Sequence, residues 1–139
     1  MAELDRYGTA DFGHGELNDQ LDLDALVDEI GLDSDEIAWR KEFIGFDEAD
    51  VERLSAYERR FAENAEQIAD DFYENLSRYE ETVEVIGRSP KGIDALKRTQ
   101  SAYLTALVGG SYGTEYFRQR ARIGKLHDML DMPMKHYLG

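Results

Sequence analysis

Apolar residues recur along most of this chain at the three- and four-residue spacing of amphipathic α-helices. The strongest pattern covers residues 47–77, about eight helical turns, and no glycine or proline interrupts it. Its apolar positions are Val51, Leu54, Tyr57, Phe61, Ala65, Ile68, Phe72 and Leu76. The pattern predicts either one long helix or two consecutive helices with one apolar face.

Two shorter helices are predicted before this segment. Residues 21–30 and 35–44 each carry an apolar pattern that a glycine ends, at Gly31 and at Gly45. Acidic residues within 33–36 precede the second helix, where negative charge favours the N-terminal end of the helix dipole.

Two more helices are predicted in the C-terminal half. Ser89 and Pro90 suit the cap and the first turn of one helix, and Thr114 can cap the next. Pro133 suits the first turn of yet another helix, close to Gly139. No segment alternates apolar and polar residues as a strand would, so the predicted fold class is all-α.

The predicted organisation is one domain preceded by a leader. Residues 1–19 contain three glycines and little periodic apolar content, which predicts a flexible acidic leader. Residues 20–139 are enough for a single hydrophobic core.

The chain is strongly acidic, with 30 Asp and Glu against 16 Lys and Arg and a formal charge of −14. The acids are spread along the whole sequence, which indicates a solvated surface suited to the salt-rich cytoplasm of a halophile. Such a surface repels phosphate backbones, so nucleic acid is not an expected partner.

The absence of cysteine excludes disulfides and thiolate metal sites. No run of 18 apolar residues and no signal-peptide pattern occurs, so we expect a cytoplasmic protein without membrane insertion.

Three polar residues lie on apolar helix faces and are candidates for chemistry. His127 carries an imidazole, a common ligand of metals that include heme iron. Tyr73 follows a phenylalanine, and Thr99 lies one turn from both Leu96 and Tyr103. The ordinary alternatives are a satisfied core histidine, a packed tyrosine ring with a solvated hydroxyl, and a threonine bonded to the carbonyl one turn back.

Several sequence blocks resemble the globin domain of globin-coupled sensors, in particular that of haloarchaeal heme-based aerotaxis transducers. The most specific block is Arg120-Ala-Arg-Ile-Gly-Lys-Leu-His127, with a tyrosine ten residues later. The other blocks are Ile30-Gly-Leu-Asp33, Asp35-Glu-Ile-Ala-Trp-Arg40, Asp71-Phe-Tyr-Glu-Asn-Leu76 and Tyr137-Leu-Gly139. The resemblance covers nearly the whole chain.

The resemblance implies a heme site with residues in defined roles. His127 matches the proximal ligand of heme b, iron protoporphyrin IX, and Tyr73 and Thr99 match the hydroxyl donors on the opposite, distal side. Oxygen gains negative charge when it binds ferrous iron, so a hydroxyl donor favours it over carbon monoxide. Tyr137 matches a tyrosine near the proximal side. The matching pocket walls are Phe72, Leu96, Tyr103 and Ile123.

The resemblance also implies a sensor that binds O2 reversibly, with CO or NO as further gases, and signals for aerotaxis. Expected partners are a second copy of the chain, in a homodimer of the full-length form, and a methyl-accepting-type transmitter domain or a chemotaxis kinase complex. We expect no enzyme, because nothing in the sequence pairs a nucleophile with a base.

Two features depart from the resembled family. Its members continue with two more long helices, so we expect a globin-like fold that lacks its last two helices and leaves apolar surface uncovered. His136 also stands where relatives carry a bulky apolar residue. We expect His136 at the surface, with a perturbation of the proximal side as the alternative.

Two other functions compete with oxygen sensing. One is an interaction module of the same fold without heme. His127 and Tyr73 argue against this alternative, whereas the expected lack of the last two helices argues for it. The other is a heme enzyme such as a peroxidase or dioxygenase, which would need a distal acid–base pair or an arginine over the iron.

Overall fold

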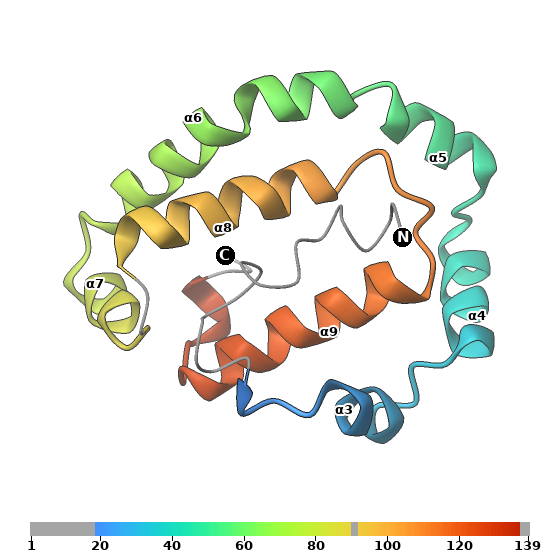
Figure 1. Cartoon of the computed structure of the whole chain (residues 1–139), viewed down its shortest axis with the longest axis horizontal. Helices are drawn as coiled ribbons and strands as arrows, with labels where there is room; N and C mark the ends of the chain where they lie inside the picture. The colour runs from blue at the N-terminus through green and yellow to red at the C-terminus, as the bar shows by residue number, and fades with distance from the viewer. Residues whose placement is uncertain (1–18, 90–91, 137–139) are drawn as a thin grey trace.

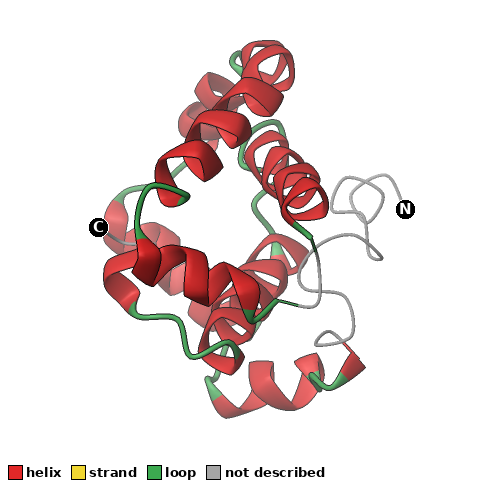
Figure 2. Ribbon diagram, turned by 90° about the vertical axis from the view of Figure 1, so that its left-hand side faces the viewer, coloured by secondary structure: helices red, strands yellow, loops and turns green. Residues whose placement is uncertain are grey.

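The computed structural model describes residues 19–89 and 92–136 (Figure 1). Within these ranges the chain forms α-helices and one short 3-10 helix and no strand (Figure 2). The helices are α3 (Leu23–Glu29), α4 (Ser34–Ile44), α5 (Glu48–Ser55), α6 (Glu58–Leu76), α7 (Glu80–Gly87), α8 (Ile93–Ala106), α9 (Thr114–Met129) and η1 (Met134–His136). The predicted all-α class is confirmed, whereas the predicted leader, 1–19, falls almost wholly outside the described residues.

The first helices begin and end where local sequence signals predicted. The Asp33 side chain caps α4 by accepting a hydrogen bond from the backbone N–H of Glu36 at 2.8 Å. Asp47 and Asp50 form a reciprocal capping box at the start of α5. Gly45 ends α4 in the left-handed conformation, with φ of 71°, which glycine adopts without steric cost.

The long apolar pattern over 47–77 forms two helices rather than one. The helix breaks at Ala56 and Tyr57, although neither residue is a helix breaker. The beginning of α6 packs against the loop after α8, where the Glu58 carboxylate lies beside Gly109. A Cβ atom added at Gly109 would lie 2.5 Å from the carboxylate carbon of Glu58. The φ angle of Gly109 is 81°, in the left-handed region. This tertiary contact accompanies the change of direction between α5 and α6.

Two local predictions are corrected, and one helix was not predicted. The helix expected after Ser89 begins only at Ile93, with Gly92 at its N-cap, and Pro90 lies outside the described residues. Thr114 is the first residue of α9 rather than its cap, which is Gly113. Helix α7 was not predicted, because eight residues contain only about two turns of periodic pattern.

Two groups of described helices lie on opposite sides of the view in Figure 1, α6 with α8 above and α9 with α3 below. In one group α6 packs closely along α8, and the ion pair between Lys97 and Asp70, 3.2 Å apart, joins the two helices. In the other group α9 contacts α3 and α4, and Arg118 lies 2.6 Å from Asp24 of α3. The arrangement leaves the inner side of α9 facing α8.

The buried stripe of α6 is offset from the predicted apolar face. Ala65 and Ala69 are each 1% exposed and Tyr73 is 9% exposed, at a spacing of four residues. Ile68 and Phe72, which the pattern included, are 45% and 36% exposed. Small alanines allow α6 to approach α8 closely, so the larger residues lie along the edge of the contact.

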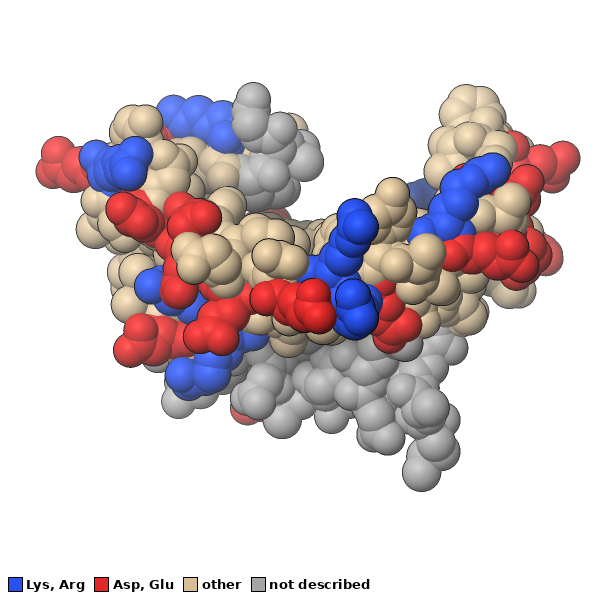
Figure 3. Space-filling view, turned by 90° about the horizontal axis from the view of Figure 1, so that it is seen from above, with Lys and Arg blue, Asp and Glu red and all other residues tan. Residues whose placement is uncertain are grey.

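Charged residues lie among uncharged ones on the outer surface seen from above in Figure 3. Acidic and basic side chains are interspersed over the face seen from the α6 side (Figure 3). Most ion pairs join exposed residues three or four apart on one helix, such as Arg40 with Glu36 and Arg59 with Glu63. No helix in the described ranges is both long and apolar enough to cross a membrane.

Candidate functional site

A cavity of about 430 Å³ lies among α6, α7, α8, α9 and η1. Its volume falls within the range of about 300–1,000 Å³ that is common for small-molecule sites. The structure places seven of the eight predicted site residues around this one cavity, whereas Tyr137 lies outside the described residues. The seven are Phe72, Tyr73, Leu96, Thr99, Tyr103, Ile123 and His127.

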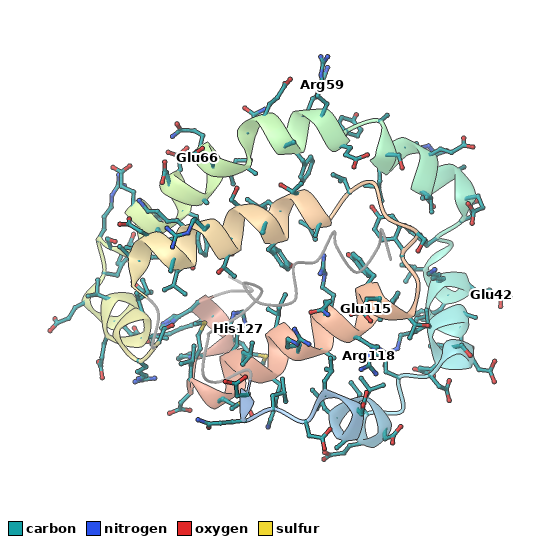
Figure 4. The ribbon with its side chains drawn as sticks, in the orientation of Figure 1. Glu42, Arg59, Glu66, Glu115, Arg118 and His127 are labelled. Atoms are coloured by element: carbon teal, nitrogen blue, oxygen red, sulfur yellow. The ribbon has the colours of Figure 1, made fainter. Side chains whose placement is uncertain are left out.

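His127 reaches the cavity from the last turns of α9. Its side chain lies on the inner side of that helix, whereas Glu42, Arg59 and Glu66 point outward (Figure 4). Burial lowers the pKa of the His127 imidazole below its usual value, because desolvation disfavours the charged form. The neutral form is the one whose ring nitrogen can ligate a metal.

Tyr73 contributes a phenol from α6. Burial raises the pKa of this phenol to about 12, so the hydroxyl keeps its proton over the physiological range. The Phe72 ring contacts the Tyr73 ring edge to face, with centroids 5.1 Å apart. Tyr73 therefore presents a protonated hydroxyl donor at the cavity wall.

Thr99 lines the cavity from α8, and its hydroxyl is engaged with its own helix. The Oγ1 atom donates a hydrogen bond to the carbonyl oxygen of Ala95 at 3.1 Å. This is the ordinary bond of a helical threonine to the carbonyl one turn back. To donate to a ligand, the hydroxyl would have to give up this bond.

Apolar side chains form most of the remaining wall. Leu96 on α8 is 3% exposed and Leu126 on α9 is fully buried. Tyr103 and Ile123 pack against buried Ala106, where α8 and α9 come together. These walls limit the access of water and strengthen electrostatic interactions inside the cavity.

Arg120 lines the same cavity and was not predicted as a site residue. Its guanidinium lies between two aromatic rings, 4.8 Å from the centroid of Tyr103 and 4.1 Å from that of Tyr116. All three guanidinium nitrogens are buried without a hydrogen-bond partner. The sequence could have indicated Arg120 as a site residue, because it lies three or four residues from Tyr116 and Ile123 and therefore on the same helix face as His127.

His136 was expected at the surface, and this expectation is wrong. Its side chain is 8% exposed and lines the cavity from η1. Its Nε2 atom lies 3.1 Å from an oxygen of Glu81 on α7, which also pairs with Lys135 at 2.7 Å. Hydrogen bonds from Lys135 and His136 lower the pKa of the Glu81 carboxyl. These two contacts of Glu81 connect η1 to α7.

The donor set fits heme better than a bare metal ion. No group of three or more His, Cys, Asp or Glu residues in the described part of the chain could hold a metal ion. One neutral imidazole in a largely apolar cavity is instead what a macrocycle needs, because the porphyrin supplies the other iron ligands. The residues present therefore fit the group that the sequence resemblance implies.

Comparisons with known proteins identify the family of this chain. The model of the protoglobin family matches residues 33–139. A curated relative, the heme-based aerotactic transducer HemAT of Halobacterium salinarum, is 44% identical over 131 residues. The match covers 94% of this chain and 26% of that relative, so the chain spans about a quarter of its length. No solved structure matches the chain significantly.

Proposed function

Because this chain belongs to the protoglobin family, we propose that it is a globin-coupled sensor domain that binds heme b and takes up oxygen reversibly. The observation that supports the proposal is the meeting of His127 and Tyr73, from α9 and α6, at one apolar cavity. When bound, heme supplies an iron whose open face can take a diatomic gas.

His127 is the proposed iron ligand. Its burial favours the neutral imidazole, so binding to iron would not first require the loss of a proton near neutral pH. His136 also lines the cavity, and its Nε2 atom lies 3.1 Å from an oxygen of Glu81.

Tyr73 is the proposed hydrogen-bond donor to the gas. Its raised pKa keeps the hydroxyl protonated, and its buried position lets a single hydrogen bond act without competition from water. Oxygen accepts such a bond more strongly than carbon monoxide, so the donor favours oxygen. Thr99 has a supporting role, because its hydroxyl already donates to Ala95.

The proposal extends to signalling. The relative is by its name an aerotactic transducer. We propose that the present chain is the gas-binding input of such a cytoplasmic sensor. The same proposal includes homodimerisation of the full-length form. It also includes coupling to a methyl-accepting-type transmitter domain or a chemotaxis kinase complex, and a sensory role rather than an enzymatic one.

Absorption spectroscopy with added hemin tests the proposal. The 139-residue chain is expected to bind one heme and, when reduced, to give a five-coordinate ferrous spectrum. His127→Gly should abolish stoichiometric uptake, and added imidazole should restore it. His136→Gln is the matched control and should keep the wild-type spectrum.

A chain that takes up no heme under any condition would contradict the proposal and favour a cofactor-free interaction module. An unchanged five-coordinate spectrum in His127→Gly would show that another residue ligates the iron.

A further inference from the structure

We propose that Arg120 binds a propionate carboxylate of the heme, an inference that rests on the proposed heme-binding function. Arg120 is the only lysine or arginine among the described residues that line the cavity. The cavity therefore has one permanently positive position, on the same helix as the proposed iron ligand.

The surroundings of the Arg120 guanidinium leave its hydrogen-bond donors for a ligand. The rings of Tyr103 and Tyr116 compensate part of the charge through their π faces, but they accept no conventional hydrogen bond there. The Nε, Nη1 and Nη2 atoms are all buried and without an acceptor. A buried cation with unmade hydrogen bonds is costly, so an anion that enters the cavity would gain from pairing with it.

The lack of an acidic partner is informative in so acidic a chain. The other arginine that bridges elements near the cavity, Arg88, donates to the carbonyl oxygens of Leu130 and Asp131. On α9 itself, Arg118 pairs with Asp24. Arg120 differs from both, because it lines the cavity and none of its guanidinium nitrogens pairs with a carboxylate of the described residues.

The spacing of Arg120 and His127 along α9 suits a ligand that contacts both residues. Arg120, Ile123 and His127 lie at steps of three and four residues and so share one face of the helix. Seven residues of α-helix rise about 10.5 Å. This length is comparable to the distance from the centre of a porphyrin to the carboxylate on its propionate arm, allowing for the reach of the arginine.

The geometry of the two tyrosines also favours a carboxylate. The guanidinium carbon lies over both rings, and these contacts use none of its N–H donors. The planar edge of a guanidinium matches the two oxygens of a carboxylate. A neutral ligand of the same shape would leave the charge unpaired.

The test compares ferric protoporphyrin IX with its dimethyl ester, in which both carboxylates are neutral. Wild-type protein should bind the free acid about 10- to 100-fold more tightly than the ester, as expected for a buried charge-assisted hydrogen bond. Arg120→Gln should weaken binding of the free acid by a similar factor and leave binding of the ester unchanged. Arg120→Lys should fall between the two, because an ammonium cannot form the paired contact.

Arg122→Gln is the matched control, because it removes the same charge from the same helix at a residue that does not line the cavity. It should change neither affinity. Circular dichroism of the heme-free variants checks that each one folds. The comparison of the two porphyrins in wild-type protein needs no variant.

Three outcomes would overturn the proposal. Equal affinity of wild-type protein for the two porphyrins would mean that no carboxylate is bound, and equal loss of both in Arg120→Gln would mean a structural role. In either case heme binding through His127 would still stand. Failure of wild-type protein to bind either porphyrin would instead overturn the proposed function, and this inference with it.

Discussion

The two sides of the cavity are built and equipped differently. The side formed by α6 and α8 is closely packed through Ala65 and Ala69, each 1% exposed, and offers the uncharged hydroxyls of Tyr73 and Thr99. The α9 side is packed through the large and fully buried Leu126, and it offers an imidazole and a guanidinium. Small residues bring helices together, whereas large ones hold a helix at a distance.

This contrast separates two tasks. The α9 side carries both groups that are proposed to hold the cofactor, and it packs on α3 and α4 with its other face. The α6 and α8 side carries the groups proposed to contact the gas, which need only donate a hydrogen bond. The two sides should therefore respond differently to substitution.

Removal of side-chain volume should have its largest effect on the α9 side. Leu126→Ala should lower the free energy of unfolding by about 2–5 kcal/mol, because it leaves a hole in a fully buried position. Urea unfolding followed by circular dichroism measures this change. Ile44→Ala, at a residue 73% exposed, is the control and should stay within about 0.5 kcal/mol of wild type. If Leu126→Ala lowers the free energy of unfolding by less than about 0.5 kcal/mol, α9 is loosely packed.

Removal of the phenol hydroxyl should affect oxygen specifically. Tyr73→Phe should weaken oxygen binding by about 1.5–3 kcal/mol, or roughly 10-fold or more, through the loss of one charge-assisted hydrogen bond. Stopped-flow measurement of oxygen and carbon monoxide release compares the two gases, and carbon monoxide should change little. Thr99→Val should have a smaller effect, because its hydroxyl donates to Ala95.

Tyr79→Phe, at a tyrosine 57% exposed, is the matched control and should alter neither gas. Equal changes for both gases in Tyr73→Phe would mean that the hydroxyl is not a donor to the ligand.

Added volume should be tolerated least between α6 and α8. Ala69→Leu should destabilise the protein by about 1–3 kcal/mol, because the closely packed helices have no room for a larger side chain. Ala62→Leu places the same residue at an exposed position of the same helix and should be nearly neutral. Thermal unfolding of the two variants gives the comparison. Equal stability would mean that α6 can move away from α8 without cost.

Acid should produce the smallest effect, and it should act through the α9 side. Burial lowers the pKa of His127 below 6.5, so the unfolded chain takes up this proton first as the pH falls. The free energy of unfolding of the heme-free protein should therefore be unaffected above that pH and should fall below it. His127→Gln should remove this part of the pH dependence in urea unfolding from pH 7 to pH 5. An identical slope in wild type and variant would show that His127 is not buried in its neutral form.

Local sequence was enough to predict the described helices with clear ends. Asp33 and Gly45 bound α4 through a side-chain cap and a left-handed glycine, both of which act within a few residues. The spacing of Ile123 and His127 likewise placed both on one face of α9, and both line the cavity. The family followed from the block at 120–127 and is confirmed by the family model. The roles of the individual site residues stay predictions.

Tertiary structure decided how these helices meet. The break at Ala56 and Tyr57 lies next to the contact of Glu58 with the loop at Gly109, which is distant in sequence. The buried face of α6 is the part of that helix with Ala65, Ala69 and Tyr73, and α6 packs along α8. His136 likewise contacts Glu81 of α7, which is 55 residues away in the sequence. Helical periodicity shows which residues share a face, but the neighbouring element decides how closely that face is packed.

Arg120 shows the division most clearly. The sequence alone predicts its position on the apolar face of α9, because helical spacing is a local property. Its contacts with the rings of Tyr103 on α8 and Tyr116 on α9, without a hydrogen-bonded carboxylate among the described residues, arise only when the two helices come together. A charged side chain on a helix is ordinarily solvated, and only its three-dimensional surroundings make it a candidate for binding an anion.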